Sequence, residues 1–306
     1  MNKYIELENI IKDKSRIRYN EPMKNHITAK VGGPCDVMVF PKSIDEIKQV
    51  ISYAKKNNIP YFVMGKGSNL LVADKGINMI VIKISNDFDD IKIDGEYMEV
   101  LAGTSMPKIA VIAKNNFLSG FEFACGIPGT IGGGIFMNAG AYGGEIKDVI
   151  VNVTFLDGND NIVTFDNDKL EFSYRKSYFA NHPDCVILSC KLKLKKVADT
   201  KEIEEKMLKN NTARNEKQPL EYPNFGSVFK RPEGYFVGKL ISDCNLKGYR
   251  IGGAEISKKH AGFIVNIGNA TCNDILSLIK YIQDTVNKNF GVMLTPEVKL
   301  IGGEFK

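Results

Sequence analysis

The fold is decided by Gly126-Ile127-Pro128-Gly129-Thr130-Ile131-Gly132-Gly133-Gly134, followed closely by Met137-Asn138-Ala139-Gly140-Ala141-Tyr142-Gly143-Gly144. Glycine tolerates positive φ and lacks the Cβ that holds other surfaces away, so we expect neither an ordinary packed helix nor a strand here. Successive N–H groups in a tight glycine turn form an anion-binding concavity, to which Thr130 adds a hydroxyl donor. The stretch therefore predicts a diphosphate site, with a tight packing loop as the alternative.

A second glycine loop, Gly65-Lys66-Gly67-Ser68-Asn69, follows the strand-like Tyr61-Phe62-Val63-Met64. It is not a Rossmann fingerprint, because Leu70 stands where the third glycine belongs and an extended segment follows. The chain also lacks the spacing of a P-loop. Two glycine loops of unusual type favour a different cradle for a large phosphate-bearing ligand.

Composition excludes several classes of protein. The 306 residues carry a net charge of +5 spread over scattered lysines, which suits an anionic substrate better than nucleic acid. The six cysteines and three histidines show no metal-ligand spacing, so we expect no metal and reduced thiols. The acidic N-terminus does not fit a secretion signal, and no apolar run approaches the ~20 residues of a membrane span. A cytoplasmic protein without membrane insertion is expected.

Hydrophobic patterns predict strands and helices that do not alternate strictly, which is typical of an α+β fold. Strands are expected at Asp36–Phe40, Ile80–Ile84, Met98–Leu101, Val149–Leu156, Ile162–Phe165, Val186–Leu194, Phe263–Asn266 and Val292–Leu300, and helices after Ser43, over Pro107–Ala113, within 200–219 and after Thr271. Ser43 with Glu46 and Thr271 with Asp274 have the spacing of capping boxes. The polar helix after residue 196 predicts a boundary between a two-part region, 1–196, and a smaller unit, 197–306.

Further motifs accompany the glycine loops along nearly the whole chain: Asn25-His26-Ile27-Thr28-Ala29-Lys30-Val31-Gly32-Gly33-Pro34, Ser173-Tyr174-Arg175, Gly226-Ser227-Val228-Phe229-Lys230 and Thr295-Pro296-Glu297-Val298. In this order they resemble the UDP-N-acetylenolpyruvoylglucosamine reductases, flavoenzymes that make UDP-N-acetylmuramate for bacterial peptidoglycan. The short run from Tyr174 to Val186 matches the branch that lacks an inserted tyrosine loop.

The resemblance implies a fold and a set of ligands. The region 1–196 would bind FAD non-covalently in the two-part manner of the vanillyl-alcohol-oxidase/PCMH-like type, and a smaller α+β domain, 197–306, would bind substrate. NADPH would be the hydride donor and a UDP-sugar the substrate. The sequence leaves the oligomeric state open, with a monomer favoured over an oligomer.

The resemblance implies that three residues are catalytic. Arg175 would bind the substrate carboxylate, Ser227 would donate a proton to carbon, and Glu297 would share in polarising the carboxylate, with its pKa raised by apolar neighbours. Without the resemblance, Arg175 would be read as a surface ion pair, Ser227 as a turn residue and Glu297 as an edge-strand acid.

The remaining expected site residues contact cofactor or substrate. Cofactor contacts are expected from Gly65, Lys66, Gly67, Ser68, Asn69, Gly126, Pro128, Gly129, Thr130, Gly132, Gly133, Asn138, Ala139 and Gly140. Substrate contacts are expected from Tyr174, Asn224, Lys230 and His260. Lys230 is a point charge suited to a diphosphate.

Two other classes stay open at this stage. Flavin oxidases of similar fold can attach FAD covalently, and His26 and Cys125 are the nearby residues able to form such a link. A nucleotide-binding module without chemistry is the second alternative, and it requires Arg175, Ser227 and Glu297 to be incidental.

Overall fold

The computed structural model describes residues 3–305 and divides the chain into two compact units. Unit 1 comprises residues 1–18, 37–66 and 79–214, and unit 2 comprises residues 19–36, 67–78 and 215–306. Unit 2 thus gathers two short early segments with the C-terminal third of the chain. The predicted division into an FAD-binding region, 1–196, and a substrate-binding domain, 197–306, concerns which ligand each part binds, and it stays a prediction.

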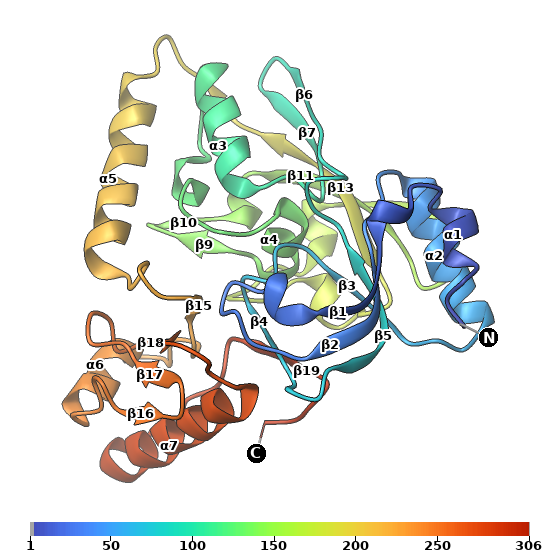
Figure 1. Ribbon diagram of the computed structural model, residues 1–306. Helices are drawn as coiled ribbons and strands as arrows, with labels where there is room; N and C mark the ends of the chain where they lie inside the picture. Colours follow the sequence, from blue (N-terminus) through green and yellow to red (C-terminus); the bar gives the residue numbers. More distant parts are fainter. Residues whose placement is uncertain (1–2, 306) are drawn as a thin grey trace. The chain divides into compact units, whose positions relative to one another are not determined.

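A five-stranded antiparallel sheet lies in unit 1 (Figure 1). Its strands, in spatial order, are β12 (Ile162–Asp166), β11 (Ile150–Leu156), β13 (Val186–Lys193), β7 (Tyr97–Leu101) and β6 (Ile91–Asp94). The predicted hairpin β11–β12 is confirmed, and Asp157 closes it by accepting the N–H groups of Asn159 and Asn161. Val186, Leu188, Cys190 and Leu192 are buried, as their alternation predicts.

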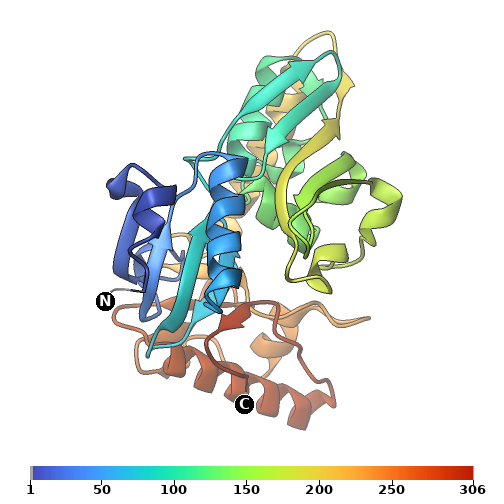
Figure 2. The same ribbon diagram turned by 90° about the vertical axis from the view of Figure 1, so that its right-hand side faces the viewer.

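A four-stranded sheet carries the first long helix. Its order is β1 (Ile17–Pro22), β2 (Pro34–Val39), β5 (Ile77–Lys83) and β3 (Tyr61–Met64), with β3 and β5 parallel. Figure 2 shows α2 (Ile44–Lys56) lying along this sheet. Ile47, Val50 and Ile51 of α2 are buried in one apolar cluster with strand residues such as Val37 and Ile80. This amphipathic face fixes the helix on the sheet.

The start of α2 departs from the predicted capping box. Ser43 Oγ accepts the Glu46 N–H, as expected, but the Glu46 carboxylate accepts the N–H of Lys42 and a two-pronged pair of bonds from Arg16. The oxygens of Glu46 lie 2.7 and 2.8 Å from the two Arg16 guanidinium nitrogens, and both side chains are largely buried. The Glu46 carboxylate therefore pairs with Arg16, which is distant in the sequence, instead of accepting the Ser43 N–H as a capping box requires. A charge-assisted bidentate pair is the stronger interaction.

We expect Glu46→Gln to lower the free energy of unfolding by about 2–4 kcal/mol at neutral pH, since it leaves the buried Arg16 charge with only the longer contact to the exposed Asp13, at 3.7 Å. The Arg16 bonds lower the pKa of Glu46 from 4.5, so the contribution of the pair is complete above that value. It is lost as the pH falls through the lowered pKa of the folded state. Denaturant titrations at several pH values would show the gap between variant and wild type closing in acid.

Glu202→Gln is the matched control, because its pair with Lys206 on α5 is exposed. We expect no measurable change in that variant. An equal loss in both variants would contradict the assigned role of Arg16.

The glycine-rich stretch contains a helix, which corrects our expectation of an irregular segment. α4 (Ile131–Met137) begins at Thr130, whose Oγ1 accepts the Gly133 N–H, and ends at Asn138 in the left-handed conformation, φ 42°. A Cβ at Gly132 would lie 3.0 Å from Ala102 Cβ, and one at Gly134 would lie 2.8 Å from Met106 Sδ. These glycines allow the helix to approach its neighbours closely, and this close packing offsets their low helix propensity.

Unit 1 contains further helices and short strands. They are α1 (Leu7–Ile10), α3 (Met106–Asn115), β8 (Leu118–Ser119), β9 (Gly140–Ala141), β10 (Gly144–Glu145), β14 (Lys195–Lys196) and most of α5 (Lys201–Lys217). The predicted helices α3 and α5 are confirmed. Among residues 3–305, no helix is both long and apolar enough to cross a membrane.

Unit 2 is built on an antiparallel sheet of order β15 (Asn224–Ser227), β18 (Phe263–Asn266), β17 (Ala254–Ile256) and β16 (Arg250–Ile251). The helix α7 (Cys272–Phe290) runs along it and packs on α6 (Val237–Asp243) (Figure 1). The predicted capping box of Thr271 and Asp274 starts α7, and Gly291 ends it at φ 67°. A parallel pair, β4 (Leu70–Val72) with β19 (Lys299–Ile301), completes the unit.

The closing strand is shorter than predicted. Regular pairing begins only at Lys299, and before it Pro296 forms a single bridge to Phe229. Proline has no N–H to donate to a ladder, which accounts for the irregular backbone ahead of β19.

Candidate active site

The two glycine loops meet in unit 1. The position of a Cβ at Gly65 lies 2.3 Å from Thr130 Oγ1, so any larger residue at 65 would displace that hydroxyl. Gly65 and Lys66 belong to unit 1, whereas Gly67, Ser68 and Asn69 belong to unit 2. The sequence distance between the loops gives no hint of this contact, but the structure brings their glycines together as one cradle requires.

Several N–H groups of the long glycine stretch already have partners within the protein. Gly129 donates to Ile127 O, Ile131 to Thr104 O, and Gly132 to Ala102 O. These N–H groups are therefore not available to bind an anion, which corrects that part of our expectation. The Gly133 N–H also has an internal partner, Thr130 Oγ1 at 3.3 Å, but Gly133 itself is exposed, and a Cβ there would lie 3.6 Å from that same oxygen. Exposed backbone at Gly133 and the hydroxyl of Thr130, which can still donate, fit a diphosphate of FAD.

Asn138 links the glycine stretch to the segment of Arg175. Its side chain is fully buried, and its Nδ2 donates to Ser173 O at 3.0 Å and to Glu145 Oε2 at 2.9 Å. Its Oδ1 accepts the Lys147 N–H. All of these bonds go to the protein, so the structure gives Asn138 a positioning role, and direct contact with a cofactor stays a prediction.

Arg175 sits in a tight turn that Asn138 helps to hold. Ser173 and Lys176 exchange both backbone hydrogen bonds, and Arg175 has a φ of 55°, which is costly for a residue with a Cβ. Its Nη2 donates to Gly140 O at 3.2 Å, and its guanidinium lies 5.1 Å from the Tyr174 ring centre. Such strained conformations cluster at functional sites, because the surrounding structure must impose them.

Ser227 ends β15 in unit 2, in a loop that Asn224 organises. Asn224 Oδ1 accepts the Gly226 N–H, and its Nδ2 donates to Pro219 O and Tyr222 O. Gly226 has a φ of 81°, which explains the glycine before the serine. The Asn224 side chain is thus used inside the loop, and its expected contact with substrate stays a prediction.

The Ser227 hydroxyl is weakly held. Its Oγ donates to Phe229 O across 3.3 Å, which is beyond the usual range for an O–H···O bond. The hydroxyl is also half-buried. A group in this state can redirect its proton to a ligand at small cost.

Glu297 lies beside this loop in the same unit. Its N–H donates to Val228 O at 2.7 Å, and its carbonyl accepts Asn69 Nδ2 at 3.2 Å. Lys230 N–H donates to Thr295 O from the other side of the Phe229–Pro296 bridge. Ser227, Lys230 and Glu297, far apart in sequence, are therefore carried by two segments that are hydrogen-bonded to each other.

A second lysine, Lys299, joins this group and was missed by sequence reasoning. The pKa of Lys299 is lowered, mainly by partial loss of hydration around its ammonium group and next by the charge of Lys230, while Glu297 opposes the shift. Two lysines close enough to perturb each other are a natural place for a diphosphate. Lysine is common throughout this chain, so no sequence signal separates Lys299 from the solvated surface.

His260 also lies near Ser227. Its Nδ1 accepts the Gly262 N–H at 3.1 Å, which leaves the proton of the neutral ring on Nε2. Burial lowers the pKa of His260, so the neutral ring is favoured at pH 7. The ring stacks edge-on against Phe263 at 4.9 Å.

Arg214 is a further cation that the sequence did not single out. Its Cδ lies 2.8 Å from the position of a Cβ at Gly126, in unit 1. It also lies close enough to Cys125 and Tyr142 to oppose the rise of both pKa values that burial causes. Its place at the end of a polar, lysine-rich helix resembles ordinary surface charge, and only the packing shows that it reaches the glycine stretch.

The residues considered for a covalent flavin bond have structural partners. His26 is buried and its Nε2 lies 2.7 Å from Glu21 Oε1. Cys125 Sγ is in contact with Met207 O and Asn211 Oδ1. All six cysteines are free thiols, and burial raises the pKa of Cys35 to about 12, which makes that thiol unreactive.

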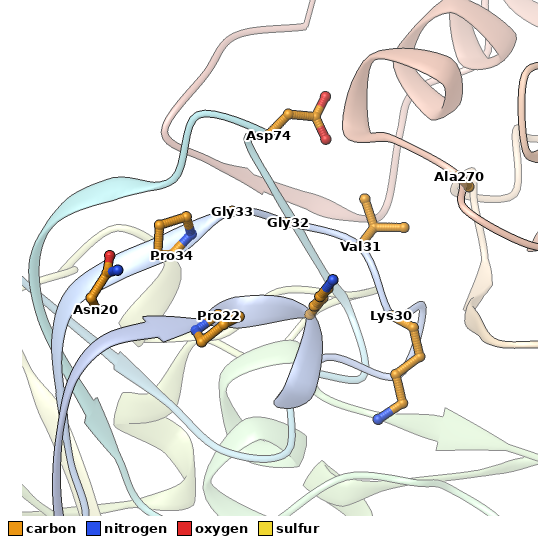
Figure 3. Close-up of a pocket in the computed structure, with 10 residues that line it drawn as sticks. Asn20, Pro22, Lys30, Val31, Gly32, Gly33, Pro34, Asp74 and Ala270 are labelled. Carbon is orange, nitrogen blue, oxygen red and sulfur yellow. The ribbon is translucent and has the colours of Figure 1, made fainter.

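A cavity of about 410 Å³ lies in unit 2, and its lining includes none of the candidate catalytic residues (Figure 3). It is lined by Asn20, Pro22, Lys24, Lys30, Val31, Gly32, Gly33, Pro34, Asp74 and Ala270. The Asp74 carboxylate accepts the N–H groups of Cys272 and Asn273 at the start of α7. A Cβ at Gly33 would lie 2.2 Å from Asp74 O, so this motif glycine serves close backbone packing.

Comparisons with known proteins identify the cofactor domain and the family. Residues 35–166 match the family model described as FAD binding domain, and residues 218–301 match the model described as UDP-N-acetylenolpyruvoylglucosamine reductase, C-terminal domain. The chain is 48% identical over 296 residues to the UDP-N-acetylenolpyruvoylglucosamine reductase of Caldanaerobacter subterraneus subsp. tengcongensis, covering 97% of each chain. It is 46% identical over 305 residues to that of Clostridium tetani, covering 99% of this chain and 98% of the relative.

A solved structure agrees with these relatives. The UDP-N-acetylenolpyruvylglucosamine reductase from Thermus caldophilus is similar with a TM-score of 0.80 and 33% identity, covering 93% of this chain and 97% of that one. The fold and the glycine cradle thus define a flavin-dependent oxidoreductase. The chain belongs to the UDP-N-acetylenolpyruvoylglucosamine reductase family.

Gly133 and Gly132 allow the cofactor cradle to be tested separately from packing. We expect Gly133→Val to lose bound FAD, while the free energy of unfolding of the flavin-free protein changes by less than about 0.5 kcal/mol, because the site is exposed. Gly132→Val should lower both the FAD content and the free energy of unfolding, since its Cβ meets Ala102. The measurements are flavin absorbance per protein and thermal unfolding; full flavin occupancy in Gly133→Val would remove this glycine from the cradle.

Proposed function

We propose that this chain reduces the enolpyruvyl ether of UDP-N-acetylglucosamine enolpyruvate to UDP-N-acetylmuramate, with Arg175, Ser227 and Glu297 as the catalytic residues. The observation that carries the proposal is the arrangement in unit 2. Ser227 and Glu297 flank one backbone hydrogen bond, from Glu297 N–H to Val228 O, with Lys230 and Lys299 beside them. Acid, proton donor and diphosphate-binding cations are what this substrate requires.

When bound, FAD would supply hydride-transfer chemistry, with NADPH as the source of the hydride. Gly65, Thr130 and Gly133 would hold its diphosphate, as their mutual contacts and exposure allow. Oxidase chemistry through a covalent flavin is not favoured, because His26 and Cys125 are engaged with Glu21 and with Met207 and Asn211.

Arg175 would stabilise the negative charge that develops on the substrate carboxylate. Hydride addition at the terminal carbon drives electron density toward that carboxylate, and a guanidinium can bind it with two parallel bonds. The left-handed turn held by Asn138 fixes the direction of the side chain before substrate binds. Such preorganisation lowers the reorganisation needed during the reaction. Glu297 would share in polarising the same group.

Ser227 would donate the proton to the carbon next to the carboxylate. A serine hydroxyl is a weak acid, but the carbanion-like intermediate is a strong base. The long bond to Phe229 O leaves the hydroxyl ready to turn toward a substrate atom. We include in this proposal a monomeric enzyme that works in the cytoplasm.

We expect Arg175→Gly and Glu297→Gln to be reduced by NADPH at near wild-type rates but to be reoxidised by substrate at least about 10²-fold more slowly. Glycine is the preferred replacement at 175, because it adopts φ 55° without strain and so reports on the side chain alone. Stopped-flow spectra of the two half-reactions under anaerobic conditions separate the steps. Failure at the NADPH step instead would overturn the assignment.

Ser227→Ala should keep FAD and its reduction by NADPH, while losing about 10²–10⁴-fold in the reaction with the enolpyruvyl substrate. Ser227→Cys should recover part of the loss, because a thiol is a stronger acid of similar size. The measurement is reoxidation of reduced enzyme by substrate, with product quantified. Wild-type rates in Ser227→Ala would transfer the proton donor role to another group.

A further inference from the structure

An exposed aromatic segment follows Lys230 in unit 2. Phe236 is 62% exposed and Tyr235 is 43% exposed. The guanidinium carbon of Arg231 lies 4.0 Å from the centre of the Phe236 ring, close enough for a stacked cation–π contact. The Arg231 guanidinium thus lies over one face of the Phe236 ring, so the pair offers a guanidinium plane and an exposed aromatic ring for stacking.

The turn that carries this surface is fixed by its own backbone. Arg231 Nε donates to Tyr235 O at 3.1 Å, and Tyr235 N–H donates to Pro232 O at 3.2 Å. Gly234 supplies the positive φ, 74°, that the turn requires. After the turn, Phe236 O accepts two N–H groups of α6. A surface ordered before binding loses less entropy when a ligand arrives.

This surface lies close to the proposed proton donor. Gly238 follows Phe236 by two residues, which span at most about 7 Å. A Cβ at Gly238 would lie 3.3 Å from His260 Cε1, and one at Gly262 would lie 3.0 Å from the same atom and 3.8 Å from Ser227 Oγ. Gly238, His260, Gly262 and Ser227 are thus in successive contact, and Lys230 directly precedes Arg231.

We propose that Arg231 and Phe236 form the platform on which the uracil base of the UDP-sugar stacks, an inference that rests on the proposed function. Nucleobases stack on aromatic rings and on guanidinium planes. The parts of the substrate occur in the order enolpyruvyl group, sugar, diphosphate and uridine. Along the chain, the protein offers Ser227, then Lys230, then the platform in the same order. NADPH also carries bases, but this order of groups belongs to the substrate.

Calorimetric titration of the FAD-loaded protein with UDP tests the platform without turnover. Phe236→Leu keeps an apolar side chain but removes the ring, and we expect its affinity for UDP to fall about 5- to 100-fold. Phe236→Trp should stay within about 3-fold of wild type, since it retains a stacking face. Affinities for inorganic pyrophosphate and for NADP⁺ should be unchanged in both variants.

Tyr281→Ala is the matched control, because Tyr281 is an exposed aromatic residue of the same unit that stacks on Tyr249. It should bind UDP like wild type. Unchanged UDP affinity in Phe236→Leu would overturn the platform, and so would an equal loss for pyrophosphate or a loss confined to NADP⁺.

The proposed function and the platform can fail separately. If the wild-type protein forms UDP-N-acetylmuramate but Phe236→Leu binds UDP as tightly as wild type, only the platform is overturned. Wild-type protein that binds UDP through Phe236 but forms no product would overturn only the proposed reaction.

Discussion

The hydrogen bond from Glu297 N–H to Val228 O is the constraint on which the candidate site in unit 2 depends. It lies next to both proposed acids, and Asn69 extends it by donating to Glu297 O and accepting the Lys299 N–H. Three segments of unit 2, around residues 69, 228 and 297, are held in register by these few bonds. A shift of one residue in any segment would turn Glu297 or Lys299 away, because side chains alternate along extended backbone.

In unit 1, one buried side chain holds separate segments in place. Asn138 ends α4 in the left-handed conformation, which asparagine tolerates better than most residues, and from there it reaches Ser173 O and Glu145. The same residue therefore terminates the helix that packs through Gly132 and fixes the turn that strains Arg175. The glycine helix α4 and the turn of Arg175 are thus linked through one amide, so we expect a residue without that amide to disturb both.

Local patterns in the sequence were sufficient for most of the fold. Alternation predicted β13, turn residues predicted the β11–β12 hairpin, and capping residues predicted the start of α7, because each depends on neighbours within a few positions. α4 was missed for the opposite reason. Its glycines have a low helix propensity. Their small size allows close packing against Ala102 and Met106, which lie on other segments. The capping role of Glu46 was mistaken because Arg16 competes for its carboxylate.

The candidate site shows the same division between local and distant causes. The motifs identified Arg175, Ser227 and Glu297 as sequence features, but nothing in them indicates the positive φ of Arg175 or the engagement of Asn224 within its own loop. Glycine motifs are the hardest to interpret, because one residue type serves three needs here. Gly226 supplies a backbone angle, Gly132 and Gly33 allow close packing, and Gly133 leaves open backbone. Only the last is a direct argument for a ligand, so a glycine-rich run predicts a cradle less specifically than the few exposed positions within it.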